Sequence, residues 1–169
     1  MPRPDLSRVP NFFHKYINLV KEDDLMTAFS NQSTSMFSFF SSIPESKYDF
    51  AYDKDKWTIK ELLQHMIDAE RVFAYRALTF SRKDQNNLPG FDENAWAPES
   101  NASARKWEDM IEEFKAVRRS TEYLFDSFND SQLDSTGKAN NHPVYVLGIG
   151  YICVGHCNHH LAILKERYL

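Results

Sequence analysis

Apolar residues recur every three or four positions along four long stretches of the chain. This spacing places them on one face of an α-helix. No stretch alternates apolar and polar residues strongly enough to predict a β-sheet protein. The pattern therefore predicts an all-α protein with long helices at residues 24–43, 59–80, 104–128 and 144–168.

The start of the second helix is marked most clearly, by the stretch WTIKELL. Thr58 is placed to cap the helix by accepting from the amide of Glu61, while Glu61 reaches back to the amide of Thr58. Four amphipathic helices of this length predict a four-helix bundle. Because no repeat or linker divides the sequence, we expect residues 1–169 to form one domain.

A long connector at residues 82–103 separates the second and third predicted helices. It contains LPGFDENAW, in which Pro89 and Gly90 predict a turn. Long connectors without regular structure are often functional. The alternative is that Phe91 and Trp96 only cover the end of the bundle, and the sequence does not choose between these two interpretations.

The composition is that of an ordinary globular protein, with 42% hydrophobic and 26% charged residues. A net charge of −4 argues against a nucleic-acid partner. No run of about 18 apolar residues is present, which argues against a membrane-spanning segment, and no signal peptide is predicted at the start. Cys153 and Cys157 lie four positions apart on one predicted helix, a poor arrangement for a disulfide. A reduced, cytoplasmic protein is therefore expected.

The stretch GHCNHH on the fourth helix contains the strongest chemical signal. His156 and His160 lie about 40° apart around the helix, inside its apolar stripe, whereas Tyr151 is expected on the opposite face. Two inward histidines one turn apart are a common source of two metal ligands. The alternative is that each imidazole forms a hydrogen bond within the core. The two cysteines could add thiolate ligands, but their spacing favours small core residues.

A third ligand would come from elsewhere in the chain. His65 lies on the flank of the apolar stripe of the second helix, while His14 and His142 are expected to be exposed. Three histidines that leave coordination positions open are typical of a catalytic metal site. Such a site would face a pocket at one end of the bundle.

Two charged residues also fall on apolar stripes, Glu70 on the second helix and Arg118 on the third. A lone buried charge is costly, so each needs a partner. We hypothesise that they form an ion pair that fixes the register of the two helices. The alternative is that Arg118 reaches an anionic substrate.

Small residues recur every seven positions on the fourth helix, at Gly148, Gly155 and Ala162. They would let another backbone approach closely. The approaching backbone could belong to the same chain or to a second copy in a homodimer, and the sequence leaves both open.

The stretches KWTIKELLQHMIDAERVFAYRAL and GYICVGHCNHHLAILKERYL, with LPGFDE between them, resemble the DinB-like (YfiT-like) metal-dependent family. The resemblance implies a four-helix bundle in up-down-down-up order, often homodimeric. It implies that His65, His156 and His160 bind the metal. His159 belongs to the motif without being a ligand. Glu70 matches a recurring acidic position. Its implied role is structural, or it contacts the metal ligands without binding the metal itself.

Characterised members of this family are similar to thiol S-transferases that use mycothiol, bacillithiol or glutathione, and others carry the label of metal-dependent hydrolase. Zinc, nickel, iron and manganese are all compatible with imidazole ligands. The leading expectation is a thiol S-transferase acting on electrophilic small molecules, since a hydrolase needs a general base and only His159 is placed to act as one. A metal-dependent hydrolase and a non-enzymatic, stress-related helical scaffold are the alternatives.

Overall fold

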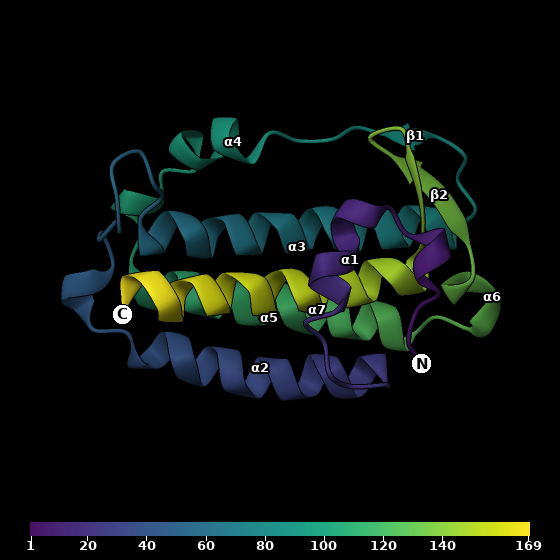
Figure 1. The fold of residues 1–169 in the computed structure, drawn as a ribbon, viewed down its shortest axis with the longest axis horizontal. Helices are drawn as coiled ribbons and strands as arrows, with labels where there is room; N and C mark the ends of the chain where they lie inside the picture. The colour runs from purple at the N-terminus through teal and green to yellow at the C-terminus, as the bar shows by residue number, and fades with distance from the viewer.

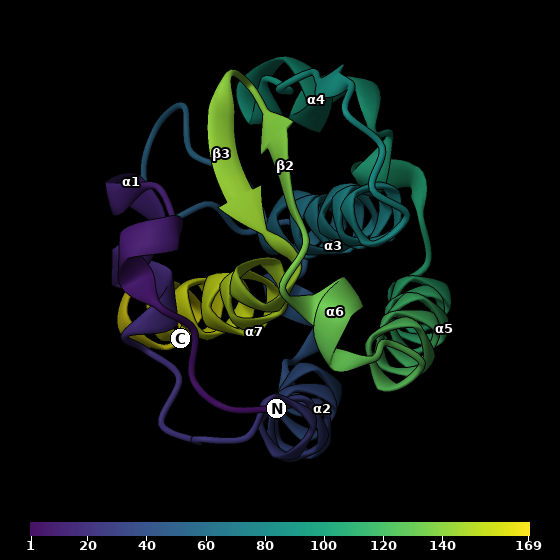
Figure 2. The same cartoon turned by 90° about the vertical axis from the view of Figure 1, so that its right-hand side faces the viewer.

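The computed structural model describes residues 1–169, most of which are helical (Figure 1). Viewed end-on, four long helices occupy the corners of a bundle in which α2 and α3 each pack against both α5 and α7 (Figure 2). The four helices are α2 (Leu25–Ser42), α3 (Ile59–Ser81), α5 (Trp107–Asp126) and α7 (Val146–Ile163).

The helix directions confirm the predicted order. In Figure 1, α2 and α7 run one way along the bundle and α3 and α5 run the other way, which is up-down-down-up. The predicted helix bounds agree with the observed ones to within a few residues. The fourth helix continues into a π-helical turn, Leu164–Tyr168, which accounts for its predicted end.

The predicted capping box at the start of α3 is present. The amide of Glu61 donates to Thr58 Oγ1 at 3.2 Å, and the amide of Thr58 donates to Glu61 Oε2 at 2.7 Å. These bonds satisfy amides that the first helical turn leaves without partners. The helix therefore starts at a defined residue, which fixes where its later side chains point.

The last helix, α7, is buried on nearly all sides because α1 (Asn11–Ile17) and the segment after it cover its outer face (Figure 2). Tyr151, expected to face outward, is fully buried, and its hydroxyl donates to the Glu22 carbonyl at 3.4 Å. That expectation was wrong because the sequence pattern alone did not indicate this covering segment. A helix that is apolar all round is a buried helix.

The small residues on α7 receive this N-terminal segment. A Cβ on Gly155 would lie 2.1 Å from the Tyr16 carbonyl oxygen, and one on Gly148 would lie 2.7 Å from the Val9 side chain. Ala162 is exposed. The two glycines are therefore occupied by contacts within the chain, and a homodimer stays a prediction.

A small sheet, absent from the sequence prediction, lies against the bundle. It consists of β1 (Asn87–Leu88), β2 (Thr136–Ala139) and β3 (His142–Tyr145), with β1 parallel to β2 and β2 antiparallel to β3. Asn140 and Asn141 turn the hairpin with φ of 50° and 64°, a left-handed conformation that asparagine tolerates. Strands of two to four residues are too short to show a clear alternating pattern.

The remaining elements are short. They are α4 (Glu93–Glu99), α6 (Asp130–Leu133) and 3-10 turns at Leu6–Arg8, Glu45–Lys47 and Ala102–Ala104. The buried apolar side chains form two clusters, of 24 and 17 residues. No helix combines the length and the apolar character that crossing a membrane would require.

Candidate metal centre

Three histidines from two antiparallel helices converge between α3 and α7. His156 Nε2 lies 3.1 Å from Nε2 of His65 and 3.0 Å from Nε2 of His160. These three residues form the one group of histidine, cysteine or acidic side chains in the protein that could surround a metal ion. The structure thus brings together the two inward histidines of GHCNHH and the candidate third ligand on α3.

The donor atoms in this cluster suit a metal better than they suit each other. A ring nitrogen carries either one hydrogen or one lone pair, so His156 Nε2 can form a good hydrogen bond with only one of its two neighbours. His160 Nδ1 is buried with no hydrogen-bond partner at all. One cation could accept all three Nε2 lone pairs, since metal–nitrogen bonds of about 2.0–2.1 Å place ligand nitrogens roughly 3 Å apart.

Burial keeps the cluster neutral. It lowers the pKa of His65 to about 4 and that of His160 to about 3. The pKa of His156 is also well below its ordinary value, first because of burial and then because His160 and His65 lie close. A neutral imidazole has a free lone pair, which is the form that binds a metal.

Aromatic rings enclose the three imidazoles. The Trp57 ring lies 4.8 Å from that of His65, while Phe73 and Tyr16 lie 5.6 Å and 5.5 Å from His156. These rings exclude water from one side of the cluster. Electrostatic interactions in such a site are stronger than they would be in water.

The cluster opens into a cavity of about 450 Å³, within the size range of small-molecule sites. The cavity runs along α3 and α7 beneath α1, the β2–β3 hairpin and the connector, so it lies on the side of the bundle and not at its end as expected. Its aromatic wall is formed by Phe12, Phe13, Tyr16, Trp57, Phe73 and Phe91.

The connector contributes directly to this cavity. Gly90, Phe91 and Glu93 line it, and the Phe91 ring packs on Trp96 with centroids 4.8 Å apart. Trp96 itself is 45% exposed. The connector therefore supplies cavity residues as well as an aromatic pair, and a functional role for it stays a prediction.

Two charged residues of the cavity were missed by sequence reasoning, Arg76 on α3 and Glu93 at the start of α4. Arg76 lies about 20° from His65 around α3, on the flank of the apolar stripe, where the pattern alone does not show that a side chain is buried. Glu93 gave no signal either, since it lies in a connector whose path the sequence does not predict. It is close enough to His65 for its charge to oppose the lowering of the His65 pKa.

The other histidines lie outside the cluster. His159 is half-buried on the cavity wall, with its ring 5.2 Å from Tyr16. His142 is exposed at the cavity rim, as predicted. His14 was expected to be exposed, but it is half-buried, and its Nε2 lies 3.0 Å and 2.9 Å from two backbone carbonyls.

The two cysteines are free and buried, and neither belongs to the histidine cluster. Cys157 faces the opposite side of α7, where Arg118 Nη2 donates to its sulfur at 3.4 Å. The prediction that Cys153 and Cys157 are small core residues is confirmed.

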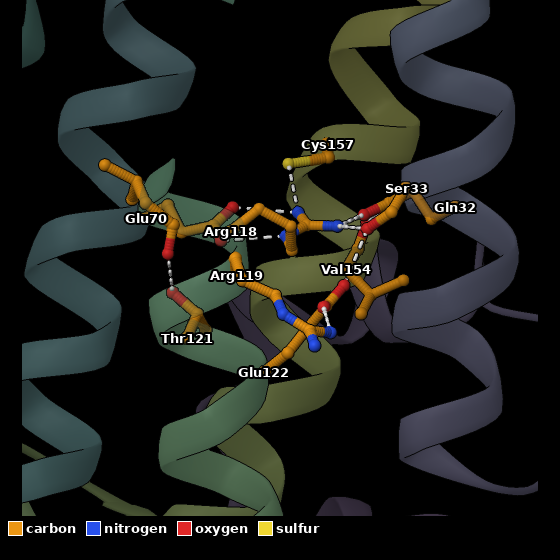
Figure 3. A network of polar contacts seen from close by, with 10 residues as sticks. Gln32, Ser33, Glu70, Arg118, Arg119, Thr121, Glu122, Val154 and Cys157 are labelled. Carbon is orange, nitrogen blue, oxygen red and sulfur yellow. Dashed lines mark hydrogen bonds and ion pairs between the residues drawn. The ribbon is translucent and has the colours of Figure 1, made fainter. Parts of the chain in front are cut away.

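Glu70 and Arg118 form the predicted ion pair (Figure 3). Arg118 Nε and Nη2 each donate to a Glu70 carboxylate oxygen at 2.8 Å, and Nη1 donates to Gln32 at 2.8 Å. Burial alone would lower the pKa of Arg118, but Glu70 raises it above its ordinary value. The alternative role for Arg118 was wrong, because its donors are used inside the protein and it does not line the cavity.

An up-down-down-up bundle with a histidine cluster between two of its helices defines the class to which this protein belongs. The sequence model of the DinB superfamily matches residues 28–164, and the chain belongs to this superfamily. No curated protein sequence matches the chain.

Among solved structures, the chain is similar to YfiT from Bacillus subtilis, with a TM-score of 0.70 and 16% sequence identity. The match covers 98% of this chain and 90% of that one. That protein is described as "a probable metal-dependent hydrolase with an unusual four-helix bundle topology". At this level of identity the likeness establishes the shared fold.

Proposed function

We propose that this chain is a divalent-metal-dependent enzyme that acts on small molecules, with His65, His156 and His160 as the metal ligands. The observation that carries the proposal is the convergence, on the wall of an aromatic cavity, of three Nε2 atoms that cannot satisfy one another. Imidazole ligands suit zinc, nickel, iron and manganese alike.

The number of ligands favours catalysis over a purely structural metal. Structural zinc sites are usually closed by four protein ligands, whereas catalytic sites keep a position open. Neither cysteine lies in the cluster, and no carboxylate does. These features count against the non-enzymatic scaffold.

The first candidate reaction is transfer of a low-molecular-weight thiol to an electrophilic small molecule. A divalent metal bound here would lower the pKa of a thiol or a water molecule and so supply a nucleophile at neutral pH. The protein's own contribution is to hold the three imidazoles neutral and to surround the reacting atoms with aromatic side chains that exclude water. The cavity is large enough for both the nucleophile and a small electrophile.

The second candidate is a hydrolase, and Glu93 is the observation that favours it. This carboxylate lines the cavity close to His65 and can accept a proton. His159, the general base suggested by the sequence, lies on the same wall. The description of the structurally similar YfiT as a hydrolase agrees with this candidate.

Metal content tests the proposal directly. Untagged protein analysed by inductively coupled plasma mass spectrometry is expected to contain about one divalent metal ion per chain. The His156→Ala, His160→Ala double variant should contain none. His142→Ala is the matched control, because it removes a histidine from the same cavity but not from the cluster. Wild-type protein that stays metal-free after incubation with zinc, nickel, iron or manganese would contradict the proposal.

The two reactions are separated by assays on the loaded protein. Conjugation of a thiol panel to an electrophile such as chlorodinitrobenzene tests the transferase, and cleavage of ester and amide substrates tests the hydrolase. Glu93→Gln should lower hydrolysis by about 10²-fold or more if the carboxylate is the general base. The same substitution should leave thiol conjugation nearly unchanged.

A further inference from the structure

Arg76 is a buried cation without an anionic partner. The residue is 8% exposed, and its Nη2 donates to the Pro89 carbonyl at 3.0 Å. That is its one hydrogen bond within the protein, and no carboxylate forms an ion pair with it. Burial lowers the pKa of Arg76, and no neighbouring charge opposes this effect.

Arg118, the second buried arginine, has the anionic partner that Arg76 lacks. Arg118, at 1% exposure, has a carboxylate held against two of its nitrogens and an amide oxygen on the third. Both side chains come from bundle helices, so the difference lies in their surroundings. A buried charge without a partner is costly. The Glu70 carboxylate offsets this cost at Arg118, and no carboxylate does so at Arg76.

The unpaired guanidinium belongs to the cavity that contains the histidine cluster. Arg76 and His65 are eleven positions apart on α3, which is about 16 Å along the helix axis and nearly the same side of it. Ala69 and Phe73 line the cavity between them. The cavity therefore contains both the three imidazoles and the Arg76 guanidinium, with Phe73 beside His156 on the wall between them.

Arg76 is also the only arginine or lysine on the wall of this cavity. The one carboxylate there, Glu93, lies near His65 and forms no ion pair with Arg76. The positive charge of Arg76 thus remains available to a ligand. A guanidinium presents a planar set of donors that matches carboxylate and phosphate groups.

We infer that Arg76 binds an oxyanion, carboxylate or phosphate, of the small molecule that reacts at the histidine cluster. The substrate is then an acid that spans the cavity, with its reactive group at the imidazoles and its anionic group at Arg76. An apolar middle portion packs against Phe73 and Phe91. The placement of the reactive group at the histidine cluster rests on the proposed function, whereas the anion site at Arg76 does not.

The test uses the full-length chain freed of metal, so that it does not depend on the proposed chemistry. Phenylbutyrate and phenyl phosphate are titrated calorimetrically beside phenylbutanamide, the neutral analogue of the carboxylate. One of the two anions should bind about ten-fold or more tightly than the amide. The anion with the greater advantage identifies the class of acid.

Variants of Arg76 and of Arg82, which directly follows the last residue of α3, locate the anion site. Arg76→Met should abolish the preference for the anion, and Arg76→Lys should restore part of it because the charge returns. Arg82→Met is the matched control, since Arg82 is exposed, lies outside the cavity and carries the same charge. It should keep the full preference.

The Tm of the ligand-free variant distinguishes a binding role of Arg76 from a structural one. Arg76→Met removes an unpaired buried charge, so the Tm of the ligand-free variant should equal or exceed that of wild type. A large fall in Tm would show that Arg76 serves the fold. Equal binding of anion and amide by wild type, absence of any binding, or an anion preference that survives in Arg76→Met would each overturn the inference.

Metal content separates failure of the anion site at Arg76 from failure of the proposed function. Arg76→Met should bind the same amount of metal as wild type, because it leaves the histidine cluster intact. Loss of anion binding with unchanged metal content supports the site at Arg76. Protein that binds no metal but keeps an Arg76-dependent anion preference would contradict the proposed function alone.

Discussion

At the scale of single residues, the Arg118–Glu70 pair and its neighbour Gln32 join three helices. Arg118 lies on α5, Glu70 on α3 and their neighbour Gln32 on α2, whose amide also donates to the Val154 carbonyl of α7 at 2.6 Å. The network in Figure 3 thus touches all four long helices. Buried networks of this kind are stable only when every member has its partners.

Substitutions at this pair should therefore be strongly non-additive. Arg118→Met leaves the Glu70 carboxylate buried and unpaired, so we expect a loss of about 3–5 kcal/mol in the free energy of unfolding. Glu70→Leu leaves the guanidinium unpaired, with a loss of similar size. The double variant leaves neither charge, and it should be more stable than either single variant. Urea denaturation followed by circular dichroism measures all three, and losses that simply add would show that the ion pair contributes no coupling.

The buried thiols lead to a prediction about reactivity. Cys153 and Cys157 are each 1% exposed, and burial raises the pKa of the Cys153 thiol well above its ordinary value. Since the thiolate is the reactive form and neither sulfur is accessible, native protein should not react with Ellman's reagent within minutes at neutral pH. Protein unfolded in guanidinium should react at both cysteines and release two equivalents of thionitrobenzoate per chain. Rapid native labelling of either cysteine would require α7 to be much less buried than the structure has it.

The sequence could identify these residues only where one helix face decides their surroundings. The angular position of Glu70 and Arg118 on apolar stripes was enough to predict their pairing, because each helix has a clear exposed face. Tyr151 was misplaced because α7 has no exposed face over that region. Arg76 lies on the flank of its stripe, where the pattern alone does not reveal that the side chain is buried.

At the scale of secondary-structure elements, helix periodicity was sufficient for the bundle but not for what covers it. The four long helices each bury apolar residues over about five turns or more, which is a strong signal. The β2–β3 hairpin and α4 are short, and their positions depend on contacts such as Gly137 against the Phe80 ring. Because these short elements form much of the cavity wall, the histidine cluster could be anticipated while the cavity could not.

The packing of α1 on α7 depends on Gly155. A Cβ at this position would lie 2.1 Å from the Tyr16 carbonyl oxygen and 2.4 Å from its carbon, which are backbone atoms that cannot rotate away. Gly155→Ala should therefore destabilise the protein by about 1–3 kcal/mol, even though alanine is the better helix former.

Hydrogen exchange should locate this loss in α1, because that helix has to move away from α7. Ala162→Ser is the matched control, an exposed change on the same strip of α7 that should alter stability by about 0.5 kcal/mol or less. A Gly155→Ala variant with wild-type stability and unchanged exchange in α1 would mean that the segment can shift at little cost.

At the scale of the whole molecule, the fold and the metal centre are expected to be largely independent. Two clusters of 24 and 17 buried apolar residues extend over the bundle, and the Arg118–Glu70 network crosses it away from the cavity. The three histidines add no closed coordination shell to this framework. A protein with a core of this size does not need a metal to fold.

Removal of metal by a chelator should therefore lower the Tm without unfolding the chain. Metal at about one hundred times its dissociation constant adds about 2.7 kcal/mol to the free energy of unfolding. For a chain of this size, that corresponds to about 5–10 °C in Tm. The metal-free protein should keep its helical circular dichroism and a single cooperative transition. The His156→Ala, His160→Ala variant should show no response to the chelator, which controls for effects of the chelator itself. Loss of helical signal on chelation would instead mean that the three histidines hold a structural metal, because the folding energy would then come from binding.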